Sequence, residues 1–147
     1  MATELNLPIV EKTFEETLGL LGETRDWVED NINSDNRPPP SERFEIMTHQ
    51  CRVITRLEWV MAWLMFRKAV SSGEINETYA LEEIEPLNGH EYFLTQHDQT
   101  ISYLPKKLEK LLESSHELYA RVARLDAMIR DVYISGDDSN TYSPLPN

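Results

Sequence analysis

The sequence predicts an all-α protein: an antiparallel three-helix bundle with long helices, which dimerises and has flexible termini. Three observations lead to this fold class. Apolar side chains recur every three or four residues from Leu104 to Val132, as they do along one face of a long helix. Three prolines at 38–40 and the glycine at 73 divide the preceding chain into two further helical segments. A chain of 147 residues, 40% of them hydrophobic, fits one domain with one core.

The first helix is expected over residues 9–32, after a flexible N-terminus at residues 1–8. Pro8 suits the first turn of a helix, where the missing N–H would have no partner in any case. Gly19 and Gly22 inside this helix favour either the close approach of a second helix or a local kink. One face carries most of the large apolar side chains: Phe14, Leu18, Leu21, Val28 and Ile32, with Arg25 among them.

The second helix is expected over residues 41–72, with Ser41 as its N-cap and Gly73 just beyond its end. From Leu57 onward its apolar residues surround the helix, so more than one side must be covered. Cys51 lies among the apolar positions earlier in this helix and is expected to be a small buried side chain. Two neighbouring helices would leave part of this apolar surface uncovered, which predicts a dimer interface. The alternative is that a deeper core within one chain covers it. The candidate interface residues are Trp59, Met61, Trp63 and Phe66.

Residues 74–103 form an acidic connection that contains no lysine or arginine. Asn76 is expected to cap a short helix over residues 77–85, which Pro86 ends. Asn88 followed by glycine marks a turn. The remainder of this connection has no clear periodicity, and its structure is not predicted.

The third helix is expected over residues 104–133, which completes a single domain at 9–133. Its buried seam follows a 4-3-4-3 spacing, and Ser115 is the one polar residue in it. The other seam residues are Leu104, Leu108, Leu111, Leu118, Val122, Leu125, Ile129 and Val132. Gly136 is expected to close the helix, and residues 134–147 then form a disordered acidic tail with little to bury.

Composition excludes several classes of function. The net charge of −12 opposes binding to nucleic acid and to anionic membranes, because the field of the protein repels phosphate. No stretch approaches the length of apolar sequence that spans a membrane, and the N-terminus lacks the pattern of a signal peptide. We therefore expect a cytoplasmic protein.

The chain offers no pattern that predicts catalysis. Glu113 and His116 have the Glu-x-x-His spacing of di-iron bundles, but such sites need a second pair, and the sequence has none. His90 and His97 lie in the acidic connection beside carboxylates, without the regular spacing of a zinc site. We expect no enzyme activity, no metal and no cofactor.

Charged and terminal residues supply candidates for partner binding. Two pairs of arginines lie among apolar positions on the second and third helices, where they could bind a partner. The alternative is that they are solvated edge residues or form ion pairs between helices. The end of the chain carries two large apolar side chains that would anchor a partner. The candidates are Arg52, Arg56, Arg121, Arg124, Tyr142 and Leu145.

Two strings of sequence resemble the signature helices of the regulator-of-CtrA-degradation (RcdA) family of alphaproteobacteria. They are RVITRLEWVMAWLMFRKAVSSGEI at residues 52–75 and SHELYARVARLDAMI at residues 115–129. In the second string, Leu118-Tyr119, Arg121-Val122 and Arg124-Leu125-Asp126 stand in the order of the family. The resemblance covers about residues 10–133.

The resemblance implies a dimeric bundle of three helices per subunit with a flexible C-terminal tail. It also implies a non-enzymatic adaptor that helps deliver cell-cycle regulators such as CtrA to the ClpXP protease. The implied partners are a second copy of the chain, a response-regulator-like adaptor associated with the protease, and protein cargo, with recruitment to the cell pole. The alternative is a helical dimeric scaffold or regulator that binds another protein and has no connection with proteolysis.

Overall fold

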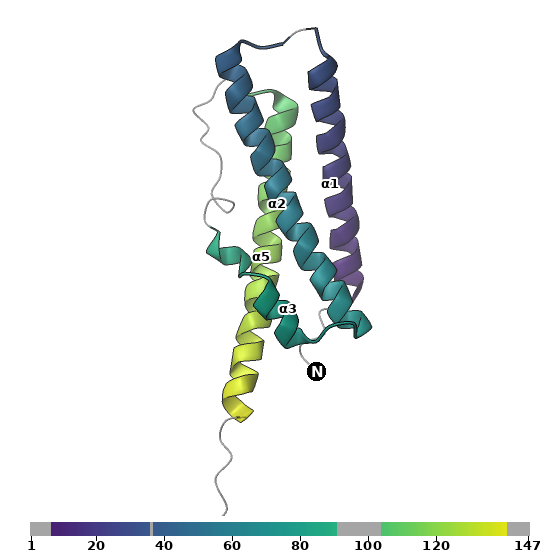
Figure 1. The fold of residues 1–147 in the computed structure, drawn as a ribbon, viewed down its shortest axis with the longest axis vertical. Helices are drawn as coiled ribbons and strands as arrows, with labels where there is room; N and C mark the ends of the chain where they lie inside the picture. Colours follow the sequence, from purple (N-terminus) through teal and green to yellow (C-terminus); the bar gives the residue numbers. More distant parts are fainter. Residues whose placement is uncertain (1–6, 36, 91–103, 141–147) are drawn as a thin grey trace, which may run out of the picture.

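The computed structural model describes residues 7–35, 37–90 and 104–140, and every regular element in these ranges is helical (Figure 1). The elements are α1 (Leu7–Asn33), α2 (Pro40–Ser72), α3 (Glu77–Glu83), the short 3₁₀ helix η1 (Leu87–Gly89) and α5 (Lys106–Asn140). The predicted all-α class is confirmed for this part of the chain. None of the described helices is long and apolar enough to cross a membrane.

The three long helices do not all alternate in direction. Contacts between α2 and α5 advance together along both helices, because Arg56 meets Ser115 and Trp63 meets Asp126. These two helices are therefore parallel, and only α1 runs against them (Figure 1). The prediction of an antiparallel bundle was wrong for this pair. The physical reason is the length of the connection, since residues 73–105 separate the two helices and parallel neighbours need a long crossover.

Helix α1 packs on the bundle through threonines as well as through apolar side chains. Thr13, Thr17 and Thr24 are buried, and each hydroxyl donates to the carbonyl four residues earlier at 2.7 Å. A threonine whose hydroxyl is satisfied by its own helix presents its methyl group to the core much as valine does. The predicted apolar face is only partly buried: Phe14 and Leu21 pack against the core, whereas Leu18 and Ile32 are exposed.

The predicted boundaries around the end of α2 are confirmed. Gly73 follows α2 with a φ of 79°, and its N–H bonds to the Val70 carbonyl while the N–H of Glu74 bonds to that of Ala69. This is the left-handed helix end that glycine allows. Asn76 then caps α3 by accepting a hydrogen bond of 2.8 Å from the N–H of Tyr79.

Helix α5 extends further than the sequence predicts. Its seam is buried from Leu104 to Val122, and beyond that point Ile129 is buried whereas Val132 is exposed. The helix continues through Gly136 to Asn140, so residues 134–140 are helical rather than part of a disordered tail. One glycine in a helix costs only about 1 kcal/mol, which is too little to end a helix this long.

Candidate functional site

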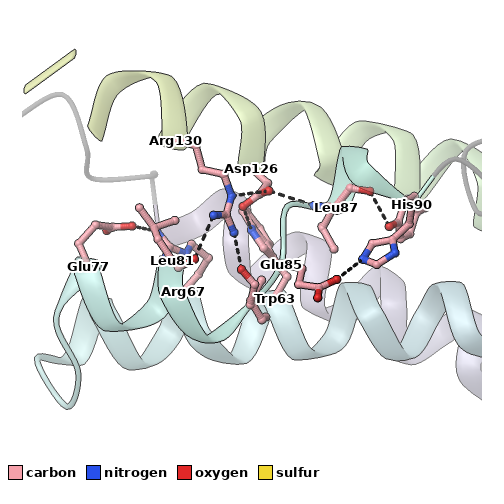
Figure 2. Close-up of polar contacts among 11 residues, drawn as sticks. Trp63, Arg67, Glu77, Leu81, Glu85, Leu87, His90, Asp126 and Arg130 are labelled. Atoms are coloured by element: carbon pink, nitrogen blue, oxygen red, sulfur yellow. Dashed lines mark hydrogen bonds and ion pairs between the residues drawn. The ribbon is translucent and has the colours of Figure 1, made fainter. Parts of the chain in front are cut away.

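A buried carboxylate joins α2, η1 and α5 (Figure 2). Asp126 on α5 is 1% exposed. One of its oxygens accepts the indole N–H of Trp63 on α2 at 3.0 Å. The other accepts the backbone N–H of Leu87 in η1 at 3.2 Å and the Nε of Arg130 at 3.0 Å. Three donors from three elements therefore share one charged acceptor, which stabilises it inside the protein.

The same cluster holds α3 in place. Arg130 donates to the carbonyls of Leu81 at 3.0 Å and Ile84 at 2.7 Å, which α3 leaves without helical partners at its end. At the start of α3, Glu77 forms an ion pair of 2.7 Å with the buried Arg67 of α2. The segment 77–89 is thus fastened to both α2 and α5.

Tyr119 completes the attachment of η1. Its hydroxyl donates to the Leu87 carbonyl at 2.7 Å, and its side chain is fully buried. Burial and the nearby charge of Asp126 raise the pKa of Tyr119 to about 12, although the charge of Arg56 acts in the opposite direction. The phenol therefore stays protonated at neutral pH, and its role in this cluster is structural.

The predicted dimer interface does not form one surface. Trp63 is 2% exposed in the single chain and bonded to Asp126, so its assignment to an interface was wrong. Trp59 and Phe66 are half-buried against the core, and the ring of His90 lies 4.6 Å from that of Trp59. The alternative, a deeper core within one chain, describes Trp63 correctly, because the indole N–H finds a buried acceptor.

Met61 points elsewhere, toward the side of α2 that faces α1. It is half-buried, and Met65 and Lys68 follow it at the spacing of one helix face. The ammonium of Lys68 lies 3.9 Å from the centre of the Phe14 ring of α1. The four predicted interface residues are therefore divided among the core and two opposite sides of α2.

The four arginines predicted to bind a partner are not all on the surface. Arg56 is fully buried and donates to α5, so its assignment to a docking surface was wrong. Arg52 is half-buried, whereas Arg121 and Arg124 are exposed. Arg121 forms an inter-helix ion pair with Glu16 of α1. Tyr142 and Leu145 lie outside the described residues.

Exposed and half-buried apolar side chains lie along one side of α1 and α2, which we call the α1/α2 groove. Sequence reasoning found these residues as apolar helix positions and assigned one of them, Met61, to the dimer interface. Cys51, which was expected to be buried, is exposed beside them. The groove comprises Phe14, Leu18, Leu21, Val28 and Ile32 of α1 with Met47, Ile54, Met61 and Met65 of α2, and Leu18, Ile32, Met47 and Met65 are the exposed members.

Hollows mark both ends of the α1/α2 groove. One, of about 330 Å³, includes Phe14, Met65 and Lys68 at the C-terminal end of α2. The other, of about 360 Å³, includes Ile32 and Met47 at the opposite end. Residues of α1 and of α2 contribute to each hollow, and the two hollows lie at opposite ends of the α1–α2 pair.

Comparison with known protein families finds one whose model matches nearly the whole chain. The family described as "Protein of unknown function (DUF1465)" matches residues 1–145. The chain belongs to the DUF1465 family. No curated protein matches it, and no solved structure matches it. The DUF1465 match spans both the Asp126 cluster and the α1/α2 groove.

In this DUF1465 chain, the two strings of sequence at residues 52–75 and 115–129 contribute buried side chains that hold the fold together. The string 52–75 supplies Trp63 and Arg67, and the string 115–129 supplies Tyr119 and Asp126. All four side chains are buried at the junction of α2, α5 and the segment 77–89. These residue types are therefore explained by the junction that they build.

The described part of the DUF1465 chain contains no group of three or more histidine, cysteine, aspartate or glutamate side chains that could hold a metal. Glu113 is exposed, and His116 is half-buried on α5. His97 lies outside the described residues. The exposed apolar side chains of the α1/α2 groove are a feature that suits binding of another protein.

Proposed function

We propose that this protein is a non-enzymatic adaptor that helps deliver cell-cycle regulators such as CtrA to the ClpXP protease. The observation that carries the proposal is the resemblance of residues 52–75 and 115–129 to the RcdA family. Both strings lie within the part of the chain that matches DUF1465. In this proposal the protein binds a response-regulator-like adaptor and cargo, and it acts in the cytoplasm and at the cell pole.

The α1/α2 groove supports a binding role on physical grounds. Leu18 and Met65 are 49% and 60% exposed. A partner that covers exposed apolar surface of this kind makes the free energy of association more favourable. We propose that the second copy of the chain covers the end of the groove around these two residues. A dimer would present each docking surface twice, and tethering of two ligands raises their effective concentration without new contacts.

The proposal is tested by degradation of CtrA in a reaction reconstituted from purified ClpXP, its response-regulator-like adaptor and this protein. Adding the protein should accelerate loss of CtrA. The double variant Leu18→Glu/Met65→Glu should be monomeric by light scattering and should lose most of the acceleration. Met128→Glu, which changes an equally exposed apolar residue of α5, is the matched control. A rate that is independent of the protein would overturn the adaptor proposal.

The C-terminal residues are a separate part of the proposal. Because α5 extends to Asn140, the tail that remains as a candidate anchor is residues 141–147, which contain Tyr142 and Leu145. Deletion of residues 141–147 leaves the described helices intact and tests this anchor in the same reaction. Unchanged degradation would remove the tail from the mechanism.

The alternative function is a helical dimeric scaffold or regulator unconnected with proteolysis. The α1/α2 groove favours it equally, since such a surface needs only a protein partner. Affinity purification from cells with the Leu18→Glu/Met65→Glu variant as reference separates the two. Protease subunits and response regulators that bind only the unmodified protein favour the adaptor, and a different set of partners favours the scaffold.

A further inference from the structure

The hollow between the end of α1 and the start of α2 has the composition of a ligand site. Its volume of about 360 Å³ falls within the range of small-molecule and peptide-anchor pockets. Four apolar side chains, Val28, Ile32, Ile46 and Met47, line it. An apolar side chain of a ligand would be removed from water here.

Two arginines stand at this hollow, although the protein as a whole carries a net charge of −12. Arg37 donates from Nη2 to the Ile32 carbonyl at 3.2 Å, which places its guanidinium beside the end of α1. Arg43 is exposed on the first turn of α2. Among the described residues that line the hollow, none carries a carboxylate. The lining itself therefore carries two positive charges and no negative charge, on a molecule that is acidic as a whole.

The backbone that follows Arg37 is conformationally restricted. Pro38, Pro39 and Pro40 follow it directly, and each proline ring fixes its own φ. The Pro39 carbonyl accepts the N–H of Arg43 at 3.0 Å, which joins the loop to the first turn of α2. A restricted backbone loses little conformational entropy when a ligand binds. The affinity is therefore higher than it would be with a mobile loop.

We propose that this hollow, which we call the Arg37/Arg43 pocket, binds a short acidic peptide segment of a partner protein. One large apolar side chain of the peptide enters between Ile32 and Met47. A neighbouring carboxylate pairs with the guanidiniums, which bind carboxylates in a planar, two-point geometry. The inference shares with the proposed function only the idea that the ligand is a protein, and it holds even if proteolysis is not the outcome.

Charge selects this occupant over others. A nucleic acid would bring many phosphates against the acidic remainder of the surface and would be repelled. A second copy of the same chain is also acidic, and it would have to place one of its own carboxylates at the pocket. An acidic segment only a few residues long meets the two arginines and covers less of the acidic surface than a larger partner would.

Selection from a displayed library of random eight-residue peptides on the full-length protein tests the proposal. The selected peptides should combine a large apolar residue with aspartate or glutamate within two positions. A fluorescein-labelled synthetic peptide of the selected sequence should bind at least tenfold more weakly to the variant Arg37→Glu/Arg43→Glu. Binding should also weaken as salt is raised, because exposed charge pairs are screened.

The matched control is Lys12→Glu/Arg124→Glu, which changes the net charge equally at exposed positions of α1 and α5 outside the pocket. It should bind the peptide within about threefold of the unmodified protein. Circular dichroism verifies that both double variants are folded. Selection of no acidic peptide, or equal binding to the pocket variant, would overturn the proposal.

Light scattering of the same variants distinguishes the remaining occupant. If Arg37→Glu/Arg43→Glu converts a dimer into a monomer, a second copy covers the pocket and the peptide proposal is wrong. The degradation reaction is measured separately. A pocket that binds no peptide in a protein that still accelerates proteolysis would refute this inference and leave the proposed function standing.

Discussion

Arg56 of α2 and Ser115 of α5 meet inside the bundle, with 3.2 Å between the guanidinium Nη1 and the serine Oγ. Neither side chain is more than 1% exposed. The same nitrogen donates to the Leu112 carbonyl at 3.0 Å. A buried charge is tolerated where hydrogen-bond acceptors replace water. Ser115 thus interrupts an apolar seam at the position where an arginine arrives from the neighbouring helix.

Removing either partner of this pair should destabilise the protein. Ser115→Ala should lower the free energy of unfolding by about 1–2 kcal/mol, because it leaves the buried arginine with one acceptor fewer. Arg56→Ala should lower it by about 3–5 kcal/mol, since it leaves a cavity and unpaired acceptors. The double variant should lose less than the sum of both, as contacting residues do. Urea denaturation measures all three, and strictly additive values would contradict a direct contact.

Asp126→Asn should loosen the segment 77–89 as well as destabilise the fold. The substitution keeps the shape of the side chain but removes the charge and turns an amide N–H₂ toward one set of donors. The expected loss is about 2–4 kcal/mol in urea denaturation. Hydrogen exchange should rise first at the Leu87 amide, which bonds to Asp126. Asp131→Asn, on the exposed side of α5, should change neither measurement.

Elements with a strong local signal were predictable from the sequence. The seam of α5 required no knowledge of its neighbours, because periodic apolar residues must be covered by something. The end of α2 at Gly73 and the cap at Asn76 follow from the backbone freedom of glycine and the short acceptor side chain of asparagine. Each of these features depends on residues close together in the chain.

Features that depend on the packing of distant residues were not predictable. Thr13 and Thr17 appear polar in the sequence, and only the burial of their methyl groups in the fold makes them core residues. Trp63 could be recognised as a core residue only once Asp126, 63 positions away, was known to accept its N–H. The same limitation concealed the α1/α2 groove, since its residues have the spacing of a buried face.

Tyr119 should make the protein sensitive to alkaline pH. Its pKa is about 12 in the folded protein, compared with 10.0 for an ordinary tyrosine, so ionisation favours the unfolded state. Its contribution to stability is complete below pH 10 and is lost as the pH rises toward 12. The difference between the two pKa values corresponds to about 2–3 kcal/mol. Urea denaturation at pH 8, 10 and 11 measures the loss.

Tyr119→Phe isolates this effect from other groups that titrate at high pH. At pH 8 the variant should be less stable by about 1–2 kcal/mol, because the Leu87 carbonyl loses its donor. Between pH 10 and 11 its stability should fall less steeply than that of the unmodified protein. Tyr79→Phe, at an exposed position, should follow the unmodified protein throughout. Parallel curves for all three proteins would exclude Tyr119 as the source.

Two glycines should respond to alanine in opposite directions. Gly19 lies inside α1, and a Cβ built there meets no atom within 4 Å, so the close helix approach that its position suggested is absent within the chain. Gly19→Ala should therefore raise the free energy of unfolding by about 0.5–1 kcal/mol through the better helix propensity of alanine. Gly73 has a φ of 79°, so Gly73→Ala should lower it by about 1–2 kcal/mol although space is equally open. Thermal denaturation of both variants measures the difference, and a loss of stability in Gly19→Ala would indicate that a second chain packs closely on α1.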